Sequence, residues 1–446
     1  MAEPTGGSAP GPVPPDRPDT ASKAEPERHD HDHGRRSGFR ALNSRGFQIY
    51  FVGMLARGTA VWMQLVMIPL LAVQLGATPV ELGIITALLF LPTLFIGALG
   101  GVLADRVDRA RVLIVSGIGS AVLSAFLWIL LLTDTANLAW VALAAVSFGV
   151  LTAIELPVRQ AYLTELVPKA DITSAVSLHA TAWNTTRFIG PVVAGVLIAT
   201  VGMAASFLIG AVIALVVSGT IVILEGYREE GRQRQQTSTS VLADLIEGAR
   251  FAFHEPRVRW PMLLVAAGGI FGIQAFQTLA PLYGTQELGL DAGAYGLYIG
   301  MWGAGAVVAA LFVTAFAHGD RRPWLIGGTL AMAVFLGLIA LVGLVVVAFA
   351  LAFALGFAQI ILIQNALITV QAAAPDALRG RVMGLYVTVF QGSSPFGAIF
   401  AGVMAGLVGV RGAMFIGAAA LAVIGVIAAV ALSRISLGRR EGTASA

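Results

Sequence analysis

Apolar stretches recur along the chain from residue 47 onwards, separated by short segments of charged residues, glycine and proline. Each stretch has about 20 residues, enough for a helix to cross roughly 30 Å of hydrocarbon. A helix also pairs its backbone polar groups internally, which a membrane requires. The pattern predicts about twelve membrane-spanning helices, at 47–72, 82–104, 112–132, 138–157, 172–199, 204–224, 260–283, 294–317, 324–344, 346–373, 382–407 and 413–432.

The expected helices form two sets of six, which predicts an all-α polytopic membrane protein with two six-helix bundles. The interval between the sets is rich in arginine. Apolar residues inside it recur at helical spacing, which favours an amphipathic surface helix: Val241, Leu242, Leu245, Ala249 and Phe253. We expect a disordered cytoplasmic tail at 1–46, bundles at 47–224 and 260–433, a cytoplasmic linker at 225–259 and a cytoplasmic tail at 434–446.

The two halves also resemble each other in sequence. Aligning Pro168 with Pro375 without gaps pairs further residues of the two halves, among them Gly190 with Gly397, Gly195 with Gly402 and Gly202 with Gly409. Like halves related by an axis along the membrane normal are typical of transporters that expose a midplane site to each side in turn.

The charge distribution predicts how the helices are oriented. The chain of 446 residues is 57% hydrophobic and 12% charged, with a formal net charge of +3. If both termini are cytoplasmic, every Lys and Arg lies on the inner side, apart from Arg57 and Arg187 within spans and Arg411 on a short outer loop. We therefore expect a multi-pass membrane protein with both termini on the cytoplasmic side, and no nucleic-acid partner.

Composition and motifs argue against enzymatic, metal and cofactor chemistry. The chain has no cysteine, which excludes disulfides and thiolate metal sites. It has no phosphate-binding Walker loop and no context for a catalytic triad, so we expect neither an enzyme nor a cofactor. The run from His29 to His33 alternates histidine with aspartate and could chelate a divalent metal, but a solvated tail is the simpler interpretation.

The segment from Gly97 to Leu113 interrupts the apolar pattern most abruptly. Its glycines allow two helices to approach closely, while its charged residues need water or partners. The pattern Gly101-x-Leu103-Ala104-Asp105-Arg106-x-x-Arg109 closely resembles the signature loop of the major facilitator superfamily, between the second and third helices. It departs from that loop in one respect, because Ala110 stands where a second basic residue usually follows.

From 47 to about 432 the chain resembles this superfamily, and more narrowly its branch of enterobactin and macrolide exporters. The motifs that carry the resemblance include Trp62-Met63-Gln64, Asn184-x-x-Arg187-x-x-Gly190-Pro191, Glu247-Gly248-x-Arg250-Phe251 and Leu378-Arg379-Gly380-Arg381. The resemblance implies the two-bundle fold. It also associates the run Gly190-Pro191-x-x-x-Gly195 with export, and physically Pro191 kinks its helix while the glycines permit close packing.

The resemblance implies that the signature loop takes part in gating. Asp105 could cap the eleventh helix near Arg379 and Arg381, since an anion is stabilised at a helix N-terminus. Arg106 and Arg109 could pair with Glu155, Glu165 or Asp108. The alternative is that these charges only maintain topology.

Ionisable residues at membrane depth are costly and therefore candidate site residues. Arg57 is expected near the midplane of the first helix and Glu155 near the inner end of the fourth. Glu155 could exchange a proton for substrate while Arg57 binds an anionic or carbonyl-rich ligand; alternatively, both only snorkel or cap carbonyls. The second half has no acid well inside a span, so proton coupling runs through the first half or is absent. The amides on the seventh and tenth helices are the candidates to line the cavity: Gln274, Gln277, Gln364 and Asn365. For any single one of them, a hydrogen bond between helices is the favoured role.

We therefore expect a monomeric secondary active exporter. It would move an amphipathic organic compound, such as a drug, a macrolide-like molecule or a siderophore, out of the cell by alternating access and in exchange for protons. One alternative is an uncoupled lysophospholipid or metabolite carrier of the same fold. Another is a membrane sensor or scaffold that does not transport.

Overall fold

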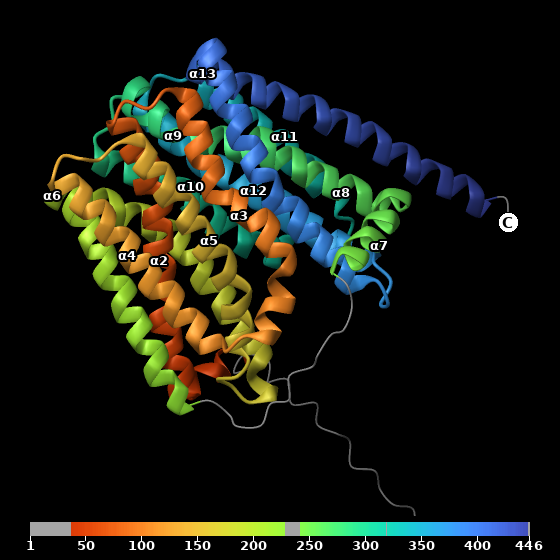
Figure 1. Ribbon diagram of the computed structural model, residues 1–446. Coiled ribbons are helices and arrows are strands. Elements are labelled where there is room, and N and C mark those ends of the chain that lie inside the picture. Colours follow the sequence, from red (N-terminus) through yellow and green to blue (C-terminus); the bar gives the residue numbers. More distant parts are fainter. Residues whose placement is uncertain (1–36, 228–240, 318, 445–446) are drawn as a thin grey trace, which may run out of the picture. The chain divides into compact units, whose positions relative to one another are not determined.

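The computed structural model describes the backbone of residues 37–227, 241–317 and 319–444, and the side chains of these residues apart from 37–39, 97–106, 241–245 and 434–444. Within these ranges all regular structure is helical, as predicted (Figure 1). The long helices are α2 (Arg45–Gln74), α3 (Pro79–Arg106), α4 (Arg109–Leu132), α5 (Leu138–Leu163), α6 (Ile172–Leu224), α10 (Ala292–Phe316), α11 (Arg322–Leu341), α12 (Val345–Ala373) and α13 (Arg379–Ala444).

One further spanning segment is built from shorter pieces. The helices α8 (Pro256–Ala267) and α9 (Gln274–Leu282) continue into each other through the π-helical turn η4 (Gly268–Ile273), and a second π-helical turn, η5 (Tyr283–Glu287), follows. Together they correspond to the predicted span at 260–283. Such π-helical turns are frequent at functional sites.

The number of spans agrees with the sequence pattern once two kinks are counted. Ten segments of the described chain are long and apolar enough to cross a membrane. Two of them, α6 and α13, each break at a glycine with positive φ, 85° at Gly202 and 80° at Gly409. Each of these segments is therefore two spans joined by a turn, which gives the predicted twelve. The two glycines are paired in the internal sequence repeat.

Both predicted tails contain helix where they adjoin the bundles. The 3-10 helix η1 (Ser37–Asn43) precedes α2, and its Ala41 is fully buried with its N–H donating to Ser174 Oγ at 3.2 Å. The ion pair of Arg40 with Asp171, at 3.1 Å, also fixes this segment to the first bundle. The expectation of disorder up to residue 46 is therefore wrong for its last ten residues. At the other end, α13 continues through the predicted tail to Ala444.

The linker contains the expected helix, α7 (Val241–His254), and the residues that it buries against the protein include Gly248 and Ala252. Ala252 is buried, whereas Phe253 is 69% exposed. Gly248 lies against the backbone of Arg381, where an added Cβ would come within 2.9 Å of the carbonyl oxygen. The side chains of Val241, Leu242 and Leu245 lie outside the described part.

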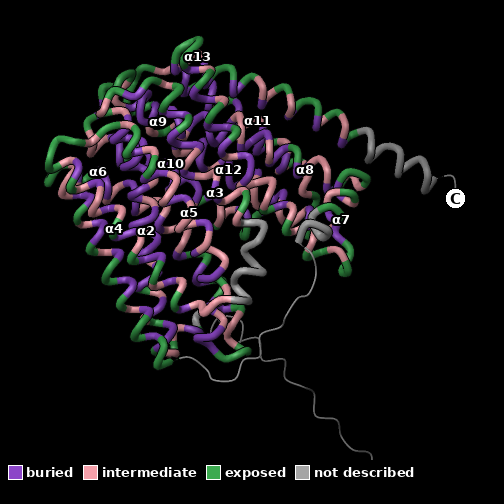
Figure 2. The backbone as a smooth tube through the Cα atoms, in the orientation of Figure 1, coloured by how far each residue is buried: buried purple, intermediate pink, exposed green. Residues whose placement is uncertain are grey.

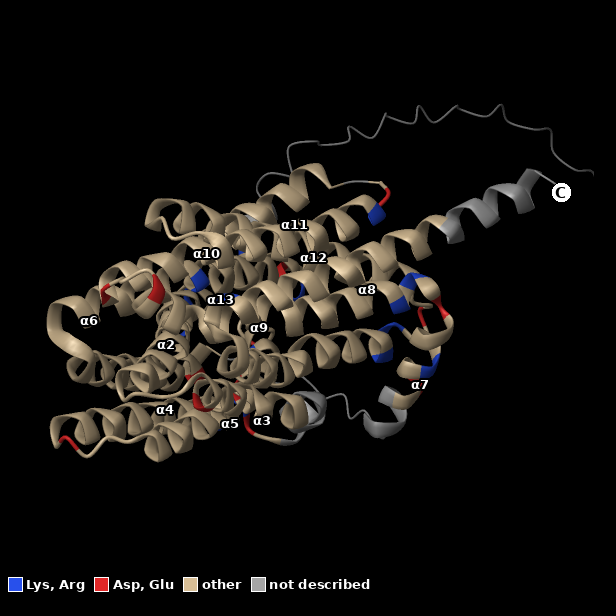
Figure 3. Ribbon diagram, turned by 90° about the horizontal axis from the view of Figure 1, so that it is seen from above, with Lys and Arg blue, Asp and Glu red and all other residues tan. Residues whose placement is uncertain are grey.

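The helices pack as a bundle of α2 to α6 and a bundle of α8 to α13. Large apolar residues are exposed on both bundles, for example Val122 of α4 at 62% and Leu311 of α10 at 67%, as expected for helices in contact with lipid. Figure 2 shows exposed residues along the outside of the helices. Charged residues concentrate near helix ends (Figure 3). We name the two ends of the molecule for use below. The basic end is the one at which α2 and α4 begin, and it carries Arg109 and Lys169. The opposite end is the one that contains the turn between α2 and α3.

Candidate functional site

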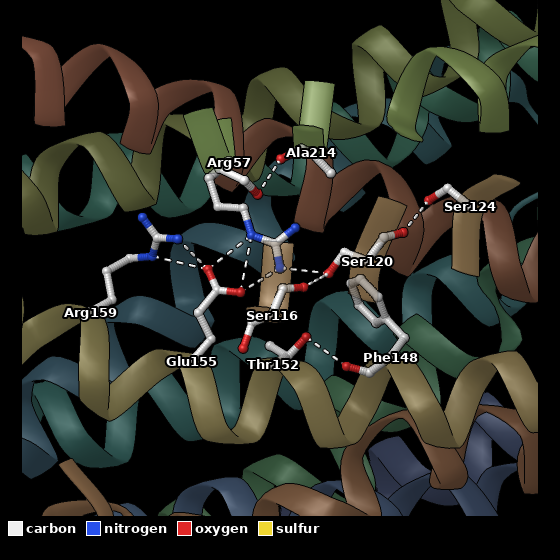
Figure 4. Close-up of polar contacts among 10 residues, drawn as sticks. Arg57, Ser116, Ser120, Ser124, Phe148, Thr152, Glu155, Arg159 and Ala214 are labelled. Atoms are coloured by element: carbon white, nitrogen blue, oxygen red, sulfur yellow. Dashed lines mark hydrogen bonds and ion pairs between the residues drawn. The ribbon is translucent and has the colours of Figure 1, made fainter. Parts of the chain in front are cut away.

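Three ionisable side chains form a buried charged cluster inside the first bundle (Figure 4). Arg57 on α2 donates from Nη2 to Glu155 Oε2 at 2.5 Å and from Nε to Oε1 at 2.9 Å. Arg159, one turn further along α5, donates from Nε to Glu155 Oε1 at 3.1 Å. All three are at most 4% exposed. Glu155 thus bridges two arginines, and the cluster carries one formal positive charge in excess.

Neighbouring helices complete this charged cluster. Arg57 Nη2 also donates to Ser120 Oγ on α4 at 2.9 Å. On the basic-end side, Tyr50 Oη lies 3.0 Å from Nδ1 of the buried His179 on α6. Arg57 and Glu155, two candidate site residues of the sequence analysis, thus lie in direct contact. Arg159 was missed as a site residue, although its spacing of four residues from Glu155 on one helix was the available signal.

The signature loop is described only in its second half. The side chains of Asp105 and Arg106, and the surroundings of Gly101, lie outside the described part. Asp108 caps α4 by accepting from the Arg111 N–H at 3.3 Å. Arg109 pairs with Glu165 at 2.5 Å, which confirms one of the predicted partners.

The two arginines expected to meet Asp105 have other carboxylate partners. Arg379 pairs with Asp376 at 2.6 Å, immediately before α13. Arg381 pairs with Glu247 of α7 at 2.5 Å, so the linker helix is joined to α13 by an ion pair as well as by backbone packing. The proposed contact of Asp105 with this region stays a prediction.

Glycines bring helices of the two bundles into direct backbone contact. A Cβ added to Gly195 on α6 would come within 2.7 Å of the Gly296 Cα on α10. In the repeated position, a Cβ on Gly402 of α13 would come within 2.7 Å of the Gly83 Cα on α3. Within the first bundle, Gly190 packs against Trp62, where its Cβ would lie 2.4 Å from the Trp62 Cβ. The predicted packing role of these glycines is confirmed.

A small cavity of about 40 Å³ lies between the bundles, close to these contacts. Its walls are mainly apolar and aromatic, with Thr86 and Gln277 as polar side chains, and come from α2, α3, α9 and α10: Trp62, Leu65, Val66, Pro69, Thr86, Leu89, Phe90, Gln277, Tyr295, Ile299 and Trp302. The two tryptophan rings are 6.4 Å apart, one from each bundle. Arg187 of α6 reaches both, with Cζ 3.9 Å from the Trp302 ring centroid and 5.3 Å from that of Trp62.

The four predicted cavity amides separate into two groups. Gln277 lines the cavity. The side chain of Gln274 donates to Gln277 Oε1 and accepts from Thr278 Oγ1, each at 3.4 Å. Asn365 is instead fully buried and accepts a hydrogen bond from Arg321 at 3.0 Å, which joins α12 to the segment before α11. Gln364 is half-buried on α12 and is not among the residues that line the cavity.

The ionisable residues of the described part offer no cluster of three or more histidines and acids close enough to hold a metal ion. The stretch from His29 to His33 lies outside it.

Comparison with known proteins identifies relatives along most of the chain. A family model, described as Major Facilitator Superfamily, matches residues 50–398. The Uncharacterized MFS-type transporter YfiS of Bacillus subtilis is 27% identical over 406 residues, 86% of this chain and 93% of that protein. The Multidrug efflux pump Tap of Mycolicibacterium fortuitum is 25% identical over 386 residues, 84% of this chain and 92% of that protein.

One relative is more similar over a shorter stretch. The Staphyloferrin A transporter of Staphylococcus aureus is 35% identical over 134 residues, 30% of this chain and 34% of that protein. Among solved structures, the nucleoside transporter NupG has a TM-score of 0.69 at 14% identity, covering 86% of this chain and 99% of that chain. A bacterial homolog of the lysosomal transporter Spinster gives 0.66 at 14% identity, covering 89% and 98%. These structures share the fold.

Proposed function

The chain belongs to the Major Facilitator Superfamily, and from this premise we propose that it is a secondary active exporter of an amphipathic organic compound. The observation that carries the proposal is the cavity between the bundles. Its lining of aromatic and aliphatic side chains with few polar groups suits a compound with a large apolar body, and residues of both bundles contribute to it.

Alternating access follows from the same geometry. A cavity of about 40 Å³ is far smaller than the roughly 300–1,000 Å³ of pockets that hold drug-sized ligands. A substrate therefore enters only when the bundles separate. The Gly195 and Gly402 contacts close the opposite end, and rocking of the bundles would open it while bringing the basic ends together.

Export is supported by two features. The Gly190-Pro191 segment of α6, which resembles the exporter motif, combines a proline inside the helix with Gly195 at the interface of the bundles, as expected for a helix that bends during rocking. One relative is also named as a multidrug efflux pump, and another as a Staphyloferrin A transporter. Drugs, macrolide-like compounds and siderophores are the corresponding substrate classes. The chain would act as a monomer in the bacterial cytoplasmic membrane, with the basic end and both termini on the inner side.

Exchange with protons is the proposed driving force, and Glu155 is the proposed carrier. Because Glu155 contacts both Arg57 and Arg159, taking up a proton would require at least one of these contacts to open during the cycle. The double contact equally supports an uncoupled carrier, in which the three residues only hold α2 and α5 together. A non-transporting sensor or scaffold is disfavoured, since it needs no cavity between separable bundles.

Efflux from preloaded cells tests these functions. Cells carrying the wild type, the Glu155→Gln variant or an empty vector are loaded with a fluorescent amphiphile, and its loss is followed with and without a protonophore. Proton-coupled export predicts faster loss than in empty-vector cells, abolished by the protonophore and by Glu155→Gln.

The remaining outcomes separate the alternatives. Loss that persists with the protonophore identifies an uncoupled carrier. Loss no faster than in empty-vector cells, at equal protein level in the membrane, rejects transport of this substrate class and leaves the sensor or scaffold.

A further inference from the structure

Arg187 is a cation at the interface of the bundles without a counter-ion. It is half-buried, and its Nε is fully buried. Among the residues whose side chains the structure describes, none accepts a hydrogen bond from this Nε, and no carboxylate lies within 4.0 Å of the guanidinium. The charged cluster of the same bundle shows the usual arrangement, in which Glu155 offsets Arg57 and Arg159. Burying an unpaired guanidinium inside the membrane costs free energy, unless a bound ligand supplies a negative charge and hydrogen-bond acceptors.

The groups around Arg187 offer hydrogen-bond donors. The indole Nε1 atoms of Trp62 and Trp302 are both buried and unpaired, and Trp302 is only 1% exposed. An indole N–H and a guanidinium can only donate. The buried and unpaired hydroxyl of Thr86, which can donate as well as accept, lines the same cavity.

The aromatic rings do not provide hydrogen-bond acceptors for these buried donors. Arg187 lies over both tryptophan faces, and this cation–π contact favours the charge at the interface. A ring face, however, accepts no conventional hydrogen bond from Arg187 Nε or from either indole. Water could occupy the cavity, but a positive charge surrounded by unpaired donors attracts an anion more strongly than a neutral acceptor.

We propose that Arg187, Trp62 and Trp302 form an anion-binding subsite, and that the transported compound is an amphipathic organic anion with a carboxylate or phosphate head. The inference rests on the proposed export function and specifies its substrate. The head would accept hydrogen bonds from Arg187 Nε and the indoles, which bind it from both bundles. The apolar body would lie along Leu65, Phe90 and Ile299 when the bundles open.

Binding to the purified full-length protein in detergent tests the subsite apart from transport. The probes are 1-naphthylacetate, its neutral isostere 1-naphthylacetamide and 1-naphthyl phosphate, titrated by calorimetry into wild type, Arg187→Lys and Arg187→Gln. Arg411→Gln is the matched control, because Arg411 also lies near an aromatic ring but already pairs with Glu287. Thermal unfolding of each variant verifies that it is folded.

We expect the wild type to bind an anionic probe at least about tenfold more tightly than the amide. Arg187→Gln should reduce this ratio to about one, Arg187→Lys should keep part of it, and Arg411→Gln should keep all of it. Comparing the affinities of 1-naphthylacetate and 1-naphthyl phosphate shows whether the subsite prefers a carboxylate or a phosphate head.

Equal binding of anionic and neutral probes by the wild type overturns the proposal, as does a preference that survives in folded Arg187→Gln. Failure of this inference differs from failure of the proposed function. If cells export an amphiphile but the protein does not prefer anionic probes, the proposed export function holds and the anion-binding subsite is wrong. If the protein prefers anionic probes through Arg187 but no efflux occurs, the subsite holds and the export function is wrong.

Discussion

Gly195 on α6 and Gly296 on α10 lie in backbone contact across the interface of the two bundles, and a Cβ on either would come within 2.7 Å of the other's Cα. Backbone atoms cannot move aside as a flexible side chain can. Any larger residue at either position therefore separates the bundles at the opposite end.

Replacing Gly195 by leucine should thus abolish transport without unfolding either bundle. We expect efflux to fall at least about tenfold, because the helices can no longer close at this point. Gly219→Leu, on the same helix, is the control, since nothing lies within 4 Å of a Cβ there. Efflux assays in cells with matched membrane levels check the pair. Normal efflux by Gly195→Leu would contradict the need for close contact.

The charged cluster should tolerate loss of Arg159 better than loss of Glu155. Glu155→Gln leaves two buried guanidinium groups without a counter-charge, which costs about 3–5 kcal/mol by analogy with other buried pairs. Arg159→Met leaves the Arg57 to Glu155 pair intact, and its cost should be smaller. Unfolding in detergent measures both.

Glu287→Gln is the control for this comparison, because its ion pair with Arg411 is exposed at 36% and 35% and should contribute less than about 1 kcal/mol. A Glu155→Gln variant as stable as this control would show that the cluster is not stabilising.

The pair of Arg109 with Glu165 should connect the signature loop to the end of α5 energetically. A double-mutant cycle with Arg109→Gln and Glu165→Gln isolates their coupling, which we expect at about 1 kcal/mol given their partial burial. The more exposed pair of Arg379 with Asp376 supplies the reference cycle. Unfolding free energies of the seven proteins, the wild type being common to both cycles, provide both couplings. Equal couplings in the two cycles would argue against a special role of the loop.

The sequence predicted the helices far better than the contacts between them. Apolar length alone determines a membrane span, and the spacing of glycines indicated the interfaces. The position of Arg187 between Trp62 and Trp302 could not be predicted, because it depends on how three helices from two bundles are rotated about their axes. For the same reason, the sequence could not separate Asn365, which pairs with Arg321, from the amides that line the cavity.

The kinks of α6 and α13 should require glycine. Gly202 and Gly409 have φ of 85° and 80° with ψ of 167° and 166°, a region that is essentially restricted to glycine. A side chain there costs about 1–3 kcal/mol, so alanine at either position should lower the unfolding free energy by that amount. Nothing lies within 4 Å of a Cβ at either site, so the effect would come from backbone conformation.

Gly219→Ala is the matched control, because Gly219 has helical geometry and equally open surroundings. Its stability should be unchanged or raised, since alanine favours a helix over glycine. If thermal unfolding gives all three alanine variants the same stability, the positive φ values do not constrain these turns.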